Sequence, residues 1–218
     1  MVRRAEADEK RAFDRLLSAC FARARRTGLI DDNRQHTAAI DATGLETRHA
    51  SSHFKRRVWG RPVWHSAWPK LTAVSHAASQ LIAGVVVGLG PTQDSPRFAE
   101  AMRQAATNVN FTRVLADRGY DAEHNHVLCR NELGIRSTAI PINPRSAGRI
   151  WPKAHYRRMM KRNFPHLQYR QRAQAESGFS RHKRRLGSAL TARNEQTQYR
   201  EMRLRVLTHN LMIMADHA

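Results

Sequence analysis

The sequence predicts an α/β fold in which a mixed five-stranded sheet is flanked by helices. Three apolar, strand-like runs follow one another between residues 37 and 87, and consecutive strands of this kind favour an antiparallel meander. Helical and strand-like patterns then alternate up to residue 141, which favours parallel strands added to this meander. Two long helical patterns, at about residues 164–186 and 194–215, close the chain.

The amino-acid composition indicates a globular protein that binds a polyanion. The 218 residues are 41% hydrophobic, which is enough to form a core. Lys and Arg number 38 against 18 Asp and Glu, and the net charge of +20 repels itself unless a polyanion balances it. Nucleic acid is therefore the expected partner. Most of these cations are arginines, whose planar side chains suit phosphate oxygens, although a GC-rich genome also favours arginine.

The cysteine and apolar patterns exclude two other classes of protein. The two cysteines, Cys20 and Cys129, cannot form a disulfide framework and fit a reducing compartment. The longest apolar run, residues 81–89, is about half as long as the ~20 residues that span a bilayer. The first residues also lack the apolar core of a signal peptide. We therefore expect a cytoplasmic protein that makes no membrane contact.

The first half of the chain is expected to hold one helix and three strands. Residues 5–26 have apolar side chains at helical spacing, and Gly28 ends this helix. Residues 1–34 are accordingly predicted to be an N-terminal helical segment, and residues 35–218 to be the main domain. The three strands of the antiparallel meander are expected at residues 37–44, 71–75 and 81–87.

The second half is expected to supply the alternating helices and parallel strands. Ser95 is a candidate N-cap followed by Pro96 at the first helical position, and this helix is expected to run to about residue 108. Asp121 is expected to cap the next helix, which Gly134 ends. The remaining elements are strands at 113–117 and 137–141 and a basic, Pro- and Arg-rich insertion at 142–163.

Two acidic residues occupy positions that suggest chemistry. Asp41 and Asp117 each end an apolar strand, in the runs Ala-Ala-Ile-Asp and Val-Leu-Ala-Asp. A carboxylate there is costly to desolvate unless a cation or hydrogen-bond donors compensate it. Either acid alone could simply cap a neighbouring loop. The two together favour a shared metal site.

Glu176 is the third candidate. Residues 145–185 contain 13 Lys or Arg and this single acid. At about 100° per residue, one helix would place Tyr169, Arg172, Glu176 and Lys183 within an arc of about 60°, beside the apolar stripe that includes Phe179. The alternative interpretation is an ordinary surface ion pair between Arg172 and Glu176, worth a few tenths of a kcal/mol. That alternative leaves Asp41 and Asp117 unexplained.

Together these acids would make a site of hard oxygen ligands. Mg²⁺ or Mn²⁺ is the matching cation for Asp41, Asp117 and Glu176. Two such ions roughly 4 Å apart can activate a water or a 3′-hydroxyl and stabilise the leaving oxygen of an in-line phosphoryl displacement. The expected chemistry is therefore metal-dependent cleavage or transfer of a phosphodiester.

The spacing Tyr169-x2-Arg172-x3-Glu176-x6-Lys183 matches a family signature at every position. It resembles the Y-R-E-K signature of one large branch of the DDE transposases of bacterial insertion sequences, which have an RNase H-like catalytic domain. The runs Ala-Asp-Arg-Gly-Tyr-Asp at 116–121 and Ile-Asp-Ala-Thr at 40–43 resemble the motifs of the second and first aspartates. The resemblance covers about residues 35–215.

The resemblance implies a site, a cofactor and a partner. Asp41, Asp117 and Glu176 would be the catalytic acids and the ligands of two Mg²⁺ or Mn²⁺ ions. Double-stranded DNA, as transposon ends and as target, would be the substrate of a homodimer in a synaptic complex, in the bacterial cytoplasm and associated with the nucleoid. By the resemblance, Tyr169, Arg172 and Lys183 would hold phosphates of the transposon end. The concentration of positive charge at 145–185 adds Arg181 and Arg184 to the expected DNA contacts, and a second basic stretch adds Lys55 and Arg57.

Lys55 and Arg57 belong to the basic and aromatic stretch 53–70, which includes Trp59, Trp64 and Trp68. This stretch is expected to stack on unpaired bases and hold the DNA backbone, or alternatively to cover one face of the sheet with its aromatic side chains.

The chain also departs from the family pattern. Full-length members carry a larger N-terminal region that recognises the terminal inverted repeats, whereas about 34 residues precede the first expected strand. We therefore expect a truncated or split element. The expected function is Mg²⁺-dependent DNA cleavage and strand transfer. The alternatives are an RNase H-like nuclease or resolvase that cuts without joining, and a basic DNA-binding remnant that has no chemistry.

Overall fold

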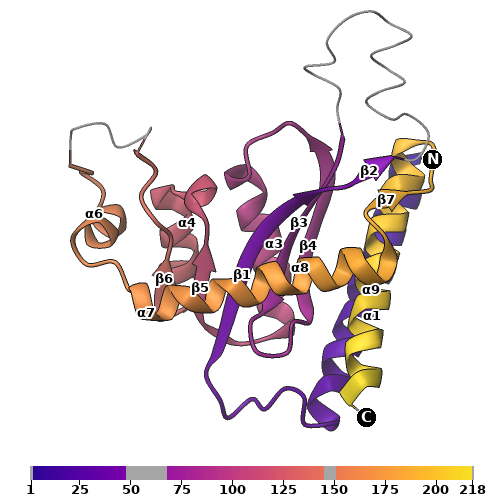
Figure 1. Ribbon diagram of the computed structural model, residues 1–218, viewed down its shortest axis with the longest axis horizontal. Helices are drawn as coiled ribbons and strands as arrows, with labels where there is room; N and C mark the ends of the chain where they lie inside the picture. Colours follow the sequence, from indigo (N-terminus) through magenta and orange to yellow (C-terminus); the bar gives the residue numbers. More distant parts are fainter. Residues whose placement is uncertain (1, 48–67, 145–150, 218) are drawn as a thin grey trace, which may run out of the picture.

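The structure is a computed structural model that describes residues 2–47, 68–144 and 151–217 (Figure 1). Lys55 and Arg57, which the sequence predicts to contact DNA, lie outside the described residues, as do Trp59 and Trp64. Trp68 is described and is partly exposed on a strand.

The centre of the fold is a five-stranded sheet with the order β4-β3-β1-β5-β6. β1 pairs antiparallel with β3 and parallel with β5, β3 pairs antiparallel with β4, and β5 pairs parallel with β6. The prediction of three antiparallel strands followed by parallel strands is therefore confirmed, and the arrangement matches an RNase H-like fold. The bounds are β1 His36–Gly44, β3 Trp68–His76, β4 Ile82–Gly90, β5 Phe111–Ala116 and β6 Ser137–Ala139.

Helices cover the sheet on both faces (Figure 1). α3 contacts β4 and β3, α8 contacts β1 and β3, and α9 packs against α1 and β4. A second, two-stranded sheet pairs the short strands β2 and β7. The bounds are α1 Val2–Arg26, β2 Glu46–Thr47, α3 Ser95–Asn108, η1 Arg118–Tyr120, α4 Glu123–Val127, η2 Leu128–Glu132, α6 His155–Arg162, α7 His166–Tyr169, η3 Arg170–Arg172, α8 Ala173–Leu186, β7 Ala189–Leu190 and α9 Glu195–His217.

Alternate side chains of the inner strands face two different apolar clusters, one on each side of the sheet. Ile40 of β1 and Ala116 of β5 face the main core, which also includes Phe21 of α1. Residues one position earlier point to the other face. There Ala39 and Leu115 form a smaller cluster, covered by side chains that precede α8 in the chain. α1 thus shares a core with the sheet, and the division of the chain into residues 1–34 and 35–218 stays a prediction.

The structure differs from the expected helices in several places. The basic insertion at 142–163 contains a helix, α6, that the sequence pattern did not predict. The expected continuous helix at 164–186 is divided into α7, the 3₁₀ turn η3 and α8. Asp121 does not cap α4, whose N-cap is Ala122; the Asp121 carboxylate instead binds Arg157. In the described segments, no helix combines the length and apolarity that crossing a bilayer requires.

Helix α8 is joined to α9 through two buried imidazoles. His182 of α8 is fully buried, and its ring centroid lies 5.5 Å from that of His209 in α9. Both ring nitrogens of His182 lack a hydrogen-bond partner among the described residues. Burial, together with the neighbouring His209, Arg205 and Lys183, lowers the pKa of His182 to about 4.

Stability is therefore expected to fall as the pH drops from about 6.5 towards 4. His182 has a lower pKa in the folded state than in the unfolded state, so protons bind preferentially to the unfolded chain across this range. The loss is up to about 1.4 kcal/mol per pH unit for one histidine. Urea unfolding of His182→Leu at several pH values should show a slope smaller by about this amount. An unchanged slope would contradict the buried, neutral state of this ring.

Candidate active site

Asp41 and Asp117 are neighbours on two parallel strands. Asp117 follows the end of β5 as expected, whereas Asp41 lies inside β1, which continues to Gly44 and does not end at the acid. Ile40 is paired in register with Ala116, so the two aspartates are the next residues along β1 and beyond the end of β5. By alternation, Asp41 lies on the same face as Ala39, and Asp117 follows Leu115 on that face. This is the face that Tyr169 covers. The sheet therefore directs the first two predicted acids to one side of the molecule.

The Asp41 carboxylate is partly buried and accepts two contacts. Its Oδ1 accepts a hydrogen bond from the backbone N–H of Ala42 at 2.9 Å and lies 3.6 Å from Nη2 of Arg172. Burial raises the pKa of Asp41, and the negative charges of Asp117 and Glu176 raise it further, against the lowering effects of Ala42 and Arg172. Asp117 and Glu176 are thus close enough to Asp41 to affect the ionisation of its carboxyl group.

Asp117 also stabilises the loop that follows it. Its Oδ1 accepts the backbone N–H of Gly119 at 2.8 Å and so caps the turn η1. A Cβ at position 119 would lie only 3.0 Å from this oxygen, which explains the glycine. Asp117 therefore caps a loop, which was the alternative interpretation for such an acid. It also lies beside Asp41.

Arg172 joins the third acid to the first. Its Nη1 lies 2.7 Å from Oε1 of Glu176, one helical turn further along the chain. The expected alternative of an Arg172–Glu176 ion pair is thus observed, but the same guanidinium also reaches Asp41. Arg172 is only 18% exposed, whereas Glu176 is 59% exposed. Desolvation acts to lower the pKa of Arg172, but Asp41 and its other anionic neighbours raise it above the usual value.

The other described residues that are predicted to contact DNA precede and follow Glu176 along the chain. Tyr169 is half-buried, with its ring 5.0 Å from that of Phe164, and burial raises its pKa. Lys183 is on the second half of α8, and within the described residues it forms no ion pair with a carboxylate. The neighbouring cations of α8 differ in exposure: Arg181 is half-buried and Arg184 is exposed.

The structure places a fourth acid, Asp94, beside this site. Asp94, and not the predicted Ser95, is the N-cap residue of α3, but its side chain makes no cap hydrogen bond; its carboxylate pairs with Lys70 of β3. Its Oδ2 is 3.5 Å from the point where a Cβ of Gly119 would lie, beside the Asp117 carboxylate. Nothing in the local pattern distinguishes Asp94 from a cap, because Lys70 is distant in sequence. The lysine largely balances its charge.

The arrangement brings carboxylate oxygens together without forming a closed metal cage. In the part of the chain that the structure describes, no three His, Cys, Asp or Glu side chains are grouped closely enough to hold one ion. The guanidinium of Arg172 lies between Asp41 and Glu176. Its Nε is buried and has no hydrogen-bond acceptor among the described residues. The site therefore offers carboxylate oxygens that can bind a cation. It also offers the unsatisfied N–H donor of Arg172, which can bind an anion.

One comparison with known proteins identifies a family. The family model described as "Transposase DDE domain" matches residues 33–211, from just before β1 to within α9. No curated protein matches the chain.

Proposed function

We propose, since this chain belongs to the transposase DDE domain family, that it cuts DNA strands and transfers the new ends to target DNA. Members of the family are transposases that act on DNA and use divalent metal ions. One observation supports placing the reacting centre here: Asp41 lies beside Asp117, and Arg172 contacts both Asp41 and Glu176. These three acids are the proposed catalytic residues.

The donor chemistry of this site fits a hard divalent cation. Asp41, Asp117 and Glu176 would hold Mg²⁺ or Mn²⁺ through carboxylate oxygens, which these ions prefer. Two bound ions would activate the attacking water or 3′-hydroxyl and stabilise the leaving oxygen. The raised pKa of Asp41 supports the same assignment, because burial, and to a smaller extent the charges of Asp117 and Glu176, disfavour its ionised form until a cation compensates it.

Arg172 and Tyr169 are proposed to hold the DNA phosphate at this centre. A guanidinium has five N–H donors, and the buried Nε of Arg172 has no acceptor among the described residues, so a phosphate oxygen can satisfy it. The raised pKa of Tyr169 keeps its phenol protonated at neutral pH, so that the hydroxyl can donate to a second oxygen. Such contacts position the scissile bond without reading its sequence.

The wider DNA contact is proposed to follow the excess positive charge. On α8, Arg181, Lys183 and Arg184 continue from the acidic centre along one helix, and the net charge of +20 favours a polyanion. Two copies of the chain are proposed to hold two transposon ends in a synaptic homodimer. Because the substrate is DNA, we place the protein with the nucleoid in the cytoplasm.

The test is an assay that separates joining from cutting. Purified protein, supercoiled plasmid and short labelled duplexes with free 3′-hydroxyl ends are incubated with Mg²⁺ or Mn²⁺, with EDTA as the control. Label transferred into the plasmid is expected, and only with metal, because the same centre activates a hydroxyl and stabilises the leaving oxygen. Metal-dependent nicks without transferred label would indicate a nuclease or resolvase instead. DNA binding without any metal-dependent product would indicate a remnant that has no chemistry.

A further inference from the structure

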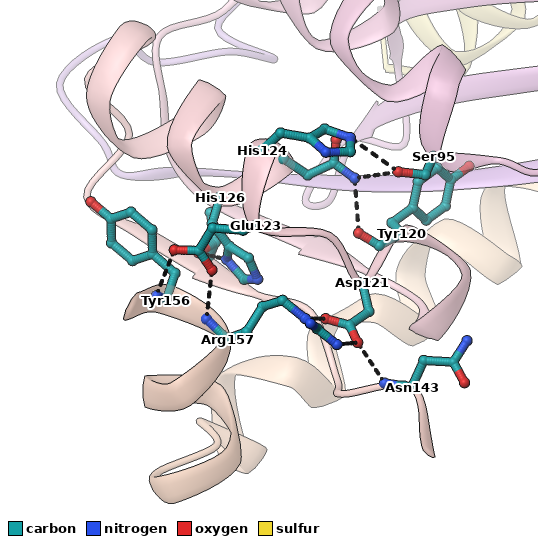
Figure 2. A network of polar contacts seen from close by, with 11 residues as sticks. Ser95, Tyr120, Asp121, Glu123, His124, His126, Asn143, Tyr156 and Arg157 are labelled. Carbon is teal, nitrogen blue, oxygen red and sulfur yellow. Dashed lines mark hydrogen bonds and ion pairs between the residues drawn. The ribbon is translucent and has the colours of Figure 1, made fainter. Parts of the chain in front are cut away.

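The basic helix α6 is bound tightly to the loop that follows Asp117. Asp121, four residues after Asp117, has a fully buried side chain, and the guanidinium of Arg157 in α6 holds it with two hydrogen bonds of 2.8 Å (Figure 2). The backbone N–H of Asn143 donates to the same carboxylate at 2.8 Å. A buried, bidentate pair of this kind is costly to break, because the remaining charge would stay buried without its partner.

A second acid fixes the start of α6. The carboxylate of Glu123 accepts the backbone N–H groups of Tyr156 and Arg157, at 2.9 and 3.0 Å, which an isolated helix would leave without partners (Figure 2). The Tyr156 hydroxyl donates to Asn131 at 2.6 Å, and its ring stacks 5.9 Å from that of His126. The helix is therefore held in both position and orientation against α4.

The exposed side chains of α6 include two cations that do not take part in these contacts. Arg158 and Arg162 are exposed, and the described residues provide no carboxylate partner for either. Arg158 donates to the carbonyls of Pro152 and Lys153, at 3.3 and 2.8 Å, so its direction is fixed while its charge is not neutralised. The sequence contains no Asp or Glu between Glu132 and Glu176. Within the described part of the chain these two charges have no carboxylate partner, so they are available to an external anion.

We propose that α6 binds the phosphate backbone of duplex DNA, and that the Arg157–Asp121 pair sets the position of this contact relative to Asp117. The proposal rests on the proposed function, because the DNA is the substrate of the same site. α6 ends at Arg162, and α7 with Tyr169 begins four residues later. The helix is therefore tied at one end to the loop of the second acid and leads at the other end to the phosphate-binding side chains.

The charge part of the proposal is tested by the salt dependence of DNA affinity. Arg158→Gln/Arg162→Gln is compared with Arg11→Gln/Arg15→Gln, which removes two exposed charges from α1 at the other end of the molecule (Figure 1). The α6 variant is expected to bind a random-sequence duplex about tenfold more weakly at low salt, with a slope of log affinity against log salt smaller by about two. The control is expected to keep the wild-type slope.

The positioning part is tested by Arg157→Lys, which keeps the charge but cannot form two parallel hydrogen bonds to Asp121. Amide hydrogen exchange in α6 is expected to accelerate at least about tenfold, and the variant is expected to show the same reduced salt slope as the α6 double variant. Unchanged exchange would overturn the role of the pair. A wild-type slope in Arg158→Gln/Arg162→Gln would overturn the α6 contact while leaving the proposed function intact. A wild-type protein that binds no DNA would overturn both.

Discussion

Asp41→Asn is expected to lower metal-dependent strand cleavage about a thousandfold or more, while DNA affinity stays within about twofold of wild type. A thousandfold loss corresponds to about 4 kcal/mol in the activation barrier, which is the several kcal/mol that metal stabilisation of a phosphoryl transition state supplies. Asparagine keeps the acceptor that Ala42 uses but loses the anionic oxygen. The same loss is expected for Asp117→Asn and Glu176→Gln.

A stability measurement separates this loss of activity from unfolding. The pKa of Asp41 is raised in the folded protein, so its contribution to stability is greatest when it is protonated and is lost as the pH rises through the folded pKa. A neutral asparagine should therefore leave stability at pH 7 unchanged or slightly higher. Glu132→Gln, which removes an exposed acid that pairs with Arg103, is the matched control and should cleave normally. Full activity in all three site variants would refute the assignment of the centre.

Gly84→Ala is expected to lower the free energy of unfolding by about 3 kcal/mol. Gly84 lies in β4 under α3, and a Cβ there would be 2.3 Å from the carbonyl oxygen of Ala101 and 2.8 Å from the backbone nitrogen of Ala105. Because these are backbone atoms of a helix, the clash is relieved only by moving α3 away from the sheet. That movement would also displace Asp94, which precedes α3 beside Asp117.

Gly178→Ala is the matched control for this prediction. A Cβ at Gly178, inside α8, would meet only Gln80 at an ordinary 3.8 Å. Alanine has a higher helix propensity than glycine, so the free energy of unfolding is expected to rise by roughly 0.5–1 kcal/mol. Urea unfolding followed by circular dichroism measures both variants. Equal effects would show that α3 does not lie as close to β4 as described.

Local patterns were sufficient to predict the strands of the sheet. The apolar runs that end at Asp41 and Asp117 identified two of them, and the alternation of elements predicted parallel strands added to the meander. The two acids were expected to share a site, but the pairing of β1 with β5, which makes them neighbours, had no local signal. The Arg172–Glu176 contact was indicated by its spacing only as the alternative interpretation, and the structure contains it. The bond from Arg172 to Asp41 had no local signal, because the two residues lie in distant parts of the chain.

The features that were missed depend on long-range partners. α6 lies in a Pro- and Arg-rich segment with little apolar periodicity, and it is stabilised by Glu123 and Asp121, more than thirty residues away in sequence. Asp121 matched the pattern of a helix cap, but its carboxylate is buried on Arg157. The two-residue strands β2 and β7 are too short to show any alternation. In each case the deciding interaction is tertiary.

The pairing of Ile40 with Ala116 limits how this chain can change during evolution. Inserting one residue into β1 between Thr37 and Asp41 would reverse the in-and-out order of everything after it, and the carboxylate would point into the apolar interior. Inserting two residues would restore the direction of the Asp41 side chain, but it would move this side chain past Asp117, its neighbour at the end of β5. Lineages that keep the reaction are therefore expected to vary in length in the loops, and to keep the number of residues in this short segment constant.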